Sequence, residues 1–303
     1  MLHKAFLSLG LLALIGNQPE TAAHFQVIEW PSLEAVISWQ APWLLSMNAP
    51  DPQAVSFVRS YLANLADQGF PAQEQGIWIQ TGSTAIATHQ GDKALSAASL
   101  TKLATTLAAL STWPLDHRFE TLVGHSGAIE NGILQGDLVI RWDRDPYFVW
   151  EEAIALANTL QAQGIQEITG NLVILGDFVM NFETDPYRSG ELFLQAVDVN
   201  RWSEEVWWIY DTMPPDTPQP SLVIQGEVLV KPATGTSDVA KWLLRHQSLH
   251  LVALLKAMNI YSNNVMAEEL AQATGGTNTV TAKVVEKTDI PLSEIRLING
   301  SGL

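Results

Sequence analysis

The sequence predicts a mixed α/β (α+β) fold, and three features of the chain support that prediction. Segments with apolar residues at helical spacing alternate along the chain with short β-branched runs bounded by glycine. Hydrophobic residues make up 47% of the chain, which excludes a disordered protein. The 303 residues are enough to bury a full core in one large domain or in two moderate ones.

Charge and cysteine content exclude several classes of function. The formal net charge is −16, so the surface repels polyanions and a nucleic-acid partner is not expected. The chain has no cysteine, which removes disulfides, thiolate zinc sites and a cysteine nucleophile together.

Residues 1–23 have the pattern of an export signal. Lys4 precedes an apolar run at 5–16 that is too short to span a bilayer, and a polar stretch then ends at Ala22-Ala23. We expect cleavage after Ala23 and an exported, periplasmic protein. The alternative is an uncleaved N-terminal anchor, which would keep the protein associated with the membrane.

The first elements expected after the signal are a helix, a hairpin and a second helix. Asp51-Pro52 supplies an N-cap followed by proline at the first helical position, and Gly69 ends the predicted helix. Residues 76–88 read as two short strands around a turn. From Ser99 onward, leucine and alanine recur at helical spacing.

Ser99 and Lys102 form an S-x-x-K pattern at the start of that second helix. Residues three apart share a helix face, so the hydroxyl and the amine are expected within reach of each other. A lysine whose ammonium is disfavoured by burial can act as the base for a serine nucleophile. In the alternative interpretation, Ser99 is an ordinary N-cap and Lys102 a solvated helix residue.

The middle of the chain is expected to contain short strands and turns. Asn131-Gly132 predicts a hairpin, and the turn at Gly136 predicts a second one. The other elements expected here are a helix at 151–163, a strand at 171–175, long irregular connections at 181–220 and a strand at 221–230.

The last part of the chain is predicted to be helical. Helices are expected at 249–258 and at 279–286, with another between them that ends at Gly275-Gly276. Ser262-x-Asn264 opens this middle helix, and taken alone it would be a pair of capping residues.

Three ordered segments together resemble one family, the penicillin-binding proteins of the D-alanyl-D-alanine carboxypeptidase/endopeptidase type. In that family a long insertion separates the first two motifs. The matching segments are Ala98-Ser99-Leu100-Thr101-Lys102-Leu103, Ser262-Asn263-Asn264-Val265-Met266-Ala267-Glu268 and Asn299-Gly300-Ser301-Gly302-Leu303. The resemblance implies a transpeptidase-like, β-lactamase-like domain formed by 24–114 and 237–303, with a mixed α+β domain inserted at 115–236.

The resemblance also implies a serine acyl-transfer mechanism. Ser99 would attack the carbonyl between two D-alanines, with Lys102 as the base. Ser262 would relay a proton to the leaving amine, and Asn264 would hold the substrate amide. Peptidoglycan stem peptides are the implied substrates and β-lactams the implied covalent inhibitors. No metal or cofactor is implied.

The sequence departs from the family pattern in two places. The family's third motif, Lys-Thr/Ser-Gly, would follow Gly300-Ser301-Gly302 and is not found, so we expect a truncated member with weak or no activity. The segment 142–146 lacks the family's glycine-rich turn, and we expect this difference to affect only the inserted domain.

Two other functions are compatible with the same residues. A non-catalytic, wall-associated protein could keep the fold without turnover. A serine β-lactamase would need a deacylating base, usually a carboxylate, and the sequence assigns none.

Overall fold

The structure is a computed structural model that describes residues 50–82, 84–234, 239–288 and 290–303. The predicted export signal at 1–23 lies outside these residues. The chain divides into two compact units: the described part of the smaller one ends at Ala97, and the larger one contains Ala98–Leu303. All three segments that carry the resemblance therefore belong to the larger unit.

The smaller unit is a helix packed on a two-stranded hairpin, as predicted. Asp51 caps the helix by accepting hydrogen bonds from the backbone N–H groups of Gln53 and Ala54, and Val58 and Leu62 are buried against Ala87 of the hairpin. The elements are α3 (Pro52–Asp67), the short 3₁₀ helix η2 (Ala72–Glu74) and the antiparallel strands β1 (Ile77–Thr81) and β2 (Thr84–His89).

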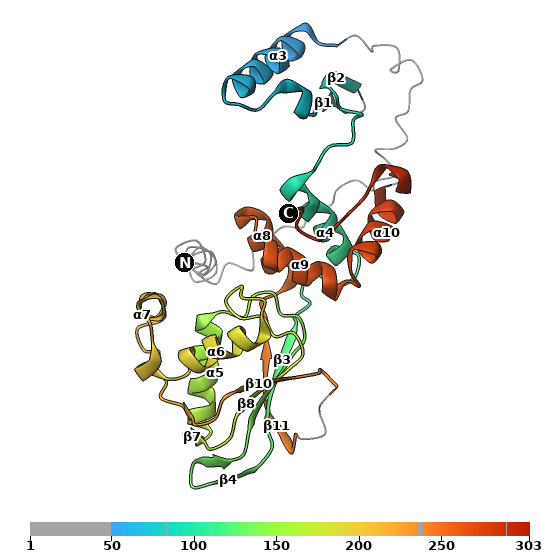
Figure 1. The fold of residues 1–303 in the computed structure, drawn as a ribbon. Coiled ribbons are helices and arrows are strands. Elements are labelled where there is room, and N and C mark those ends of the chain that lie inside the picture. Colours follow the sequence, from blue (N-terminus) through green and yellow to red (C-terminus); the bar gives the residue numbers. More distant parts are fainter. Residues whose placement is uncertain (1–49, 83, 235–238, 289) are drawn as a thin grey trace, which may run out of the picture. The chain divides into compact units, whose positions relative to one another are not determined.

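Helices from the two ends of the larger unit pack together (Figure 1). The helix predicted from Ser99 begins as a short 3₁₀ turn and contacts helices that are about 150 residues further along the chain. The elements are η3 (Ala98–Leu100), α4 (Thr101–Leu110), α8 (Leu251–Tyr261), α9 (Asn264–Ala273), α10 (Thr277–Thr288) and η6 (Leu292–Glu294).

The rest of the larger unit contains two sheets. The larger sheet has the strand order β10-β8-β6-β3-β11, in which β10, β8 and β6 are parallel and β3 is antiparallel to both of its neighbours. Its strands are β3 (Glu120–His125), β6 (Leu138–Trp142), β8 (Leu172–Leu175), β10 (Val228–Lys231) and β11 (Lys241–Gln247). The smaller sheet consists of β4 (Ala128–Glu130), β5 (Ile133–Gln135), β7 (Glu167–Ile168) and β9 (Val223–Ile224).

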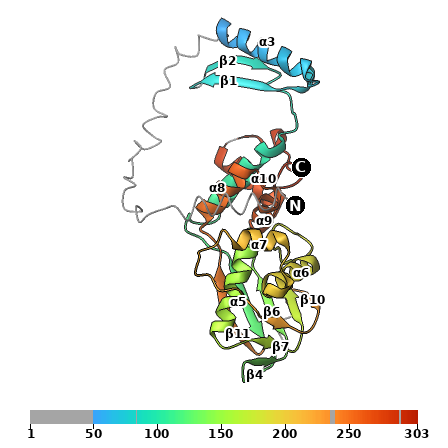
Figure 2. The same cartoon turned by 90° about the vertical axis from the view of Figure 1, so that its left-hand side faces the viewer.

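Helices cover one face of the larger sheet (Figure 2). Ile154 of α5 (Trp150–Ala162) and Phe193 of α6 (Pro186–Ala196) are fully buried in one cluster with Ile140 and Ile174 of the sheet. These contacts confirm the predicted mixed α/β fold, whose strands and helices bury complementary apolar faces. The domain boundaries expected at 115 and 236 stay predictions.

The prediction of irregular connections at 181–220 is wrong. This stretch contains α6, η4 (Val199–Arg201) and α7 (Glu204–Tyr210). Asp185 caps α6 by accepting from the N–H of Arg188, and Pro186 is the first helical residue. The same Asp-Pro signal correctly predicted α3. At α6 this signal was present too, but the surrounding stretch, rich in proline and tryptophan, has weak helical periodicity.

Two strand predictions also need correction. Gly136 does not close a hairpin, because β5 and β6 on either side of it belong to different sheets. The strand expected at 221–230 is two strands, β9 and β10, again in different sheets. In both places the chain crosses between sheets at a glycine that leaves no room for a side chain: a Cβ on Gly136 would lie 2.8 Å from the Gly127 nitrogen.

An apolar cluster joins the terminal helices to the sheet region of the larger unit. Tyr147 and Phe182 pack in it with Leu254 of α8 and Met266 of α9. The region that follows the first motif therefore contributes directly to the packing of the helix that carries the second motif. Within the part of the chain described here, no helix is both long and apolar enough to cross a membrane.

Candidate active site

Ser99 and Lys102 lie at the junction between η3 and α4. The Ser99 side chain is exposed, whereas Lys102 is only 2% exposed, so one turn of helix carries a hydroxyl accessible to solvent and a buried amine. The residue at the N-cap position of α4 is Leu100, and no side chain caps this helix. Ser99 is thus not occupied as a capping residue.

The amine of Lys102 has three polar contacts from three different segments. Its Nζ lies 3.3 Å from Ser99 Oγ, 2.5 Å from Asn264 Oδ1 and 3.1 Å from the backbone oxygen of Ser301. Burial lowers the pKa of Lys102, and the nearby charge of Glu268 partly opposes this by raising the pKa. A lowered pKa increases the neutral fraction of the amine, which is the form that can accept a proton.

Ser262 lies at the end of α8, 163 residues after Ser99 in the sequence, and contacts it. Its Oγ donates a hydrogen bond to Ser99 Oγ over 2.8 Å. Ser262 is the C-cap residue of α8 and adopts a left-handed conformation, with φ of 52° and ψ of 40°. This conformation is unfavourable for a residue with a Cβ, which indicates that the surrounding structure holds it in place.

Asn264 is the first residue of α9 and points toward Lys102. The capping residue of α9 is its neighbour Asn263, whose Oδ1 accepts from the Met266 N–H over 3.0 Å. Because Asn263 caps the helix, the side chains of Ser262 and Asn264 on either side of it are available for other contacts. The structure thus brings all four candidate residues of the sequence analysis together.

Sequence reasoning missed two participants in this site, Ser301 and Glu268. Ser301 takes part through its backbone oxygen, for which a side-chain pattern gives no signal. Glu268 accepts hydrogen bonds from the N–H groups of Gly300 and Ser301, each over 2.9 Å. The signal that could have found it is its position four residues after Asn264, on the same helix face.

This arrangement can support proton transfer from Ser99. If Lys102 is neutral, it can donate to Asn264 Oδ1 and to the Ser301 oxygen while its lone pair faces Ser99 Oγ. The Ser262 hydroxyl, which touches Ser99, can then pass a proton onward. In the described ranges, no group of side chains could hold a metal ion.

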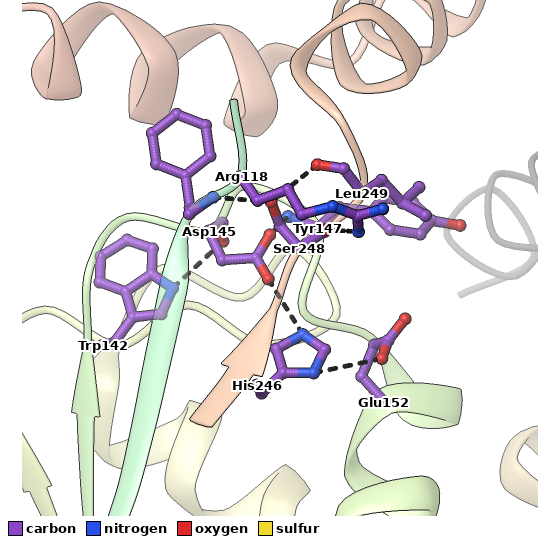
Figure 3. A network of polar contacts seen from close by, with 9 residues as sticks. Arg118, Trp142, Asp145, Tyr147, Glu152, His246, Ser248 and Leu249 are labelled. Carbon is purple, nitrogen blue, oxygen red and sulfur yellow. Dashed lines mark hydrogen bonds and ion pairs between the residues drawn. The ribbon is translucent and has the colours of Figure 1, made fainter. Parts of the chain in front are cut away.

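A second titratable cluster lies in the sheet region (Figure 3), where His246 stands between two carboxylates. Its Nε2 is 3.4 Å from Asp145 Oδ2, and its Nδ1 is 3.6 Å from Glu152 Oε2. Burial alone would lower the pKa of His246, but the two carboxylates outweigh burial and raise it. Desolvation also raises the pKa of nearby Glu151, to about 7.

The segment 142–146 does more than shape the inserted region, which corrects the expectation from the sequence. Arg144 donates to Glu269 Oε2 on α9 over 3.0 Å and lies 3.8 Å from Asp177 Oδ2. Arg144 has a positive φ of 56°. Its segment therefore contacts the helix that carries Asn264.

Comparisons with known proteins identify a family and similar folds. The chain matches the model of the D-Ala-D-Ala carboxypeptidase 3 (S13) family over residues 59–179 and 221–303. It is 35% identical over 89 residues to D-alanyl-D-alanine carboxypeptidase DacB of Haemophilus influenzae, a match that covers 29% of this chain and 19% of that protein.

Two solved structures from Bdellovibrio bacteriovorus are similar in fold. The predatory endopeptidase Bd3459 has a TM-score of 0.59 at 22% identity, covering 75% of this chain and 60% of that one. Its penicillin G-acylated form, in complex with the immunity protein Bd3460, has a TM-score of 0.58 at 23% identity, covering 75% and 59%. The chain thus spans less than two thirds of the length of these relatives.

The left-handed conformation of Ser262 predicts that glycine at this position gives a more stable protein than alanine does. Glycine adopts this conformation without the Cβ penalty, so Ser262→Gly is expected to be more stable than Ser262→Ala by about 1 kcal/mol. Both variants lose the hydroxyl that touches Ser99. Urea denaturation of the two variants measures the difference, and equal stability would contradict the assigned strain.

The buried carboxyl of Glu151 predicts a specific pH dependence of stability. Its folded-state pKa of about 7 exceeds the ordinary value of 4.5 for a glutamate, so the folded protein binds the proton more tightly than the unfolded chain. The free energy of unfolding therefore falls as pH rises from about 4.5 to 7, by on the order of 3 kcal/mol from this group.

Glu151→Gln is expected to remove this loss and to be more stable than the original protein at pH 7.5, with little difference at pH 4. Denaturant unfolding at several pH values measures it. Glu204→Gln serves as the control, because Glu204 is also in the first turn of a helix but is exposed. A parallel pH dependence of the Glu151→Gln variant and the original protein would refute the assignment.

Proposed function

Because the chain belongs to the D-Ala-D-Ala carboxypeptidase 3 (S13) family, we propose that it is a serine peptidase that hydrolyses peptidoglycan stem peptides through an acyl-enzyme on Ser99. One observation supports this most strongly. The exposed Ser99 hydroxyl contacts both the buried Lys102 amine and the Ser262 hydroxyl, at 3.3 and 2.8 Å. A nucleophile in contact with a base and a second proton carrier is the arrangement that acyl transfer requires.

In the proposed reaction, Ser99 Oγ forms a bond to the carbonyl carbon between two D-alanines while its proton moves to Lys102 Nζ. The C–N bond then breaks, Ser262 delivers its hydroxyl proton to the leaving amine, and the proton held by Lys102 passes to Ser262 to replace it. Asn264 contacts Lys102 and also binds the substrate amide. Water attacks the resulting ester and releases the product with Ser99 restored.

The proposed partners and location follow from this chemistry. β-Lactams would act as covalent inhibitors, since the similar Bd3459 is described as acylated by penicillin G. Stem peptides lie in the cell wall, so the protein would be exported, in agreement with the signal pattern at 1–23. The preference between carboxypeptidase and endopeptidase activity depends on how the leaving group is accommodated.

We also expect a polypeptide of these 303 residues to react slowly. It contains no Lys-Thr-Gly or Lys-Ser-Gly segment. In the family that strand would supply an oxyanion donor and a cation for the substrate carboxylate, and the loss of one oxyanion donor typically lowers the rate by about a hundredfold or more.

The proposed nucleophile is tested by intact-protein mass spectrometry after long incubation with benzylpenicillin. The expected result is one covalent adduct per chain, located by peptide mapping at Ser99 and missing from Ser99→Ala. Circular dichroism of both proteins controls for folding. A folded protein without an adduct would contradict the proposal and would favour a non-catalytic, wall-associated role.

The role of Lys102 as base predicts a large rate loss in Lys102→Met. Methionine fills most of the buried volume but cannot accept a proton, and a general base typically contributes about 10²–10⁴-fold to the rate. The rate of adduct formation is therefore expected to fall by at least about a hundredfold. The control is Lys256→Met, on the exposed side of α8. An unchanged rate in Lys102→Met would exclude Lys102 as the base.

A further inference from the structure

We propose that Glu268 is a positioning residue that holds Lys102 against Ser99 by fixing the backbone of the segment 299–302. The proposal rests on the proposed function, since the placement of Lys102 affects a reaction only if Ser99 is the nucleophile. In the described residues, the side-chain hydrogen bonds of Glu268 go to Gly300 and Ser301 and not to Ser99. Glu268 acts through the backbone that contacts Lys102.

The contacts run from Glu268 to Lys102 through one residue. The two oxygens of the Glu268 carboxylate accept from two consecutive N–H groups, Oε2 from Gly300 and Oε1 from Ser301, each over 2.9 Å. The backbone oxygen of the same Ser301 accepts from Lys102 Nζ over 3.1 Å. Hydrogen bonds to an ionised carboxylate are stronger than neutral ones, so this pair fixes the Ser301 peptide and its oxygen.

Other contacts besides those of Glu268 also hold the segment 299–302 in place. The hydroxyl of Thr105 on α4 donates to the Gly300 oxygen over 2.7 Å, and the Gly302 N–H donates to Asn299 Oδ1 over 2.7 Å. A Cβ on Gly300 would lie 2.5 Å from the Ala271 Cβ, so the backbone packs directly on α9. The segment 299–302 is thus held between α4 and α9, and Glu268 fixes its two central N–H groups.

Glu268 also affects Lys102 through its charge. Burial lowers the pKa of Lys102, and Glu268 is the charged group in the described chain that opposes this shift. α4 carries no other titratable residue. The other charged residues on the segments around α4 are Lys256, Glu269, Lys283, Glu286, Lys287, Glu294 and Arg296. Glu268 therefore both places the amine and limits how far its pKa falls.

Glu269 provides a matched control on the same helix. It is the same residue type, one position further along, and its carboxylate pairs with Arg144 instead of the segment 299–302. Neutralising it removes one negative charge from α9 but leaves the contacts to Gly300 and Ser301 in place. Glu268→Gln and Glu269→Gln therefore separate the proposed role from a general effect of charge on the helix.

The first measurement is amide hydrogen exchange by NMR in the full 303-residue chain. In Glu268→Gln, the amides of Gly300 and Ser301 are expected to exchange faster by about tenfold or more, because a side-chain amide can accept from only one of them. Glu269→Gln is expected to leave both rates unchanged. Unchanged exchange in Glu268→Gln would overturn the proposal, and so would equal acceleration in both variants.

The second measurement is the titration of Lys102, followed by the NMR signal of its ε-carbon and by the pH profile of adduct formation with benzylpenicillin. The midpoint is expected to move to lower pH in Glu268→Gln but not in Glu269→Gln. The rate above the midpoint is expected to fall by about tenfold, since the amine is less well placed. A residue that only stabilised the fold would lower the reactive fraction without moving the midpoint, and that result would refute the proposal.

The two readouts separate the two hypotheses. If the original protein forms no adduct, the proposed function fails, while hydrogen exchange and the Lys102 titration still decide whether Glu268 positions Lys102. If the adduct forms but neither exchange nor titration responds to Glu268→Gln, the function stands and the positioning role is refuted.

Discussion

The burial of the Lys102 amine is the constraint on which the helical part of the larger unit depends. A buried amine without hydrogen-bond partners would be costly, so the structure must supply acceptors where the side chain ends. They come from Ser99 on its own helix turn, from Asn264 on α9 and from the backbone of Ser301. Three segments far apart in the sequence therefore have to meet at one nitrogen atom.

The same requirement explains why the sheet region is relevant to the site. The position of Asn264 depends on where α9 lies, and residues of the sheet region pack against α9. Met266 packs in an apolar cluster with Tyr147 and Phe182. A region with no candidate catalytic residue of its own thus fixes the helix that carries one.

Prediction from the sequence worked best where local geometry determines the outcome. The three-residue spacing of Ser99 and Lys102 places them together on any helix, and the Asp51-Pro52 and Asn131-Gly132 signals act within a few residues. It failed where long-range packing decides: β5 and β6 flank a single turn, yet they belong to different sheets. The Ser301 oxygen could not be predicted because every residue has a backbone carbonyl, and only the fold selects one.

Backbone conformation shows how closely the segments of the site approach one another. Ala98, directly before Ser99, has a φ of 44°, and Ser262 has a φ of 52°, although neither is glycine. Gly302, with a φ of 83°, packs so tightly on Ala98 that a Cβ there would collide with the Ala98 carbonyl oxygen. Left-handed conformations at non-glycine residues cost free energy and persist only where other contacts enforce them. Both such residues lie in the segments that carry Ser99 and Ser262, so we infer that packing around Lys102 provides these contacts. The stability of the fold and the placement of the two hydroxyls are therefore linked.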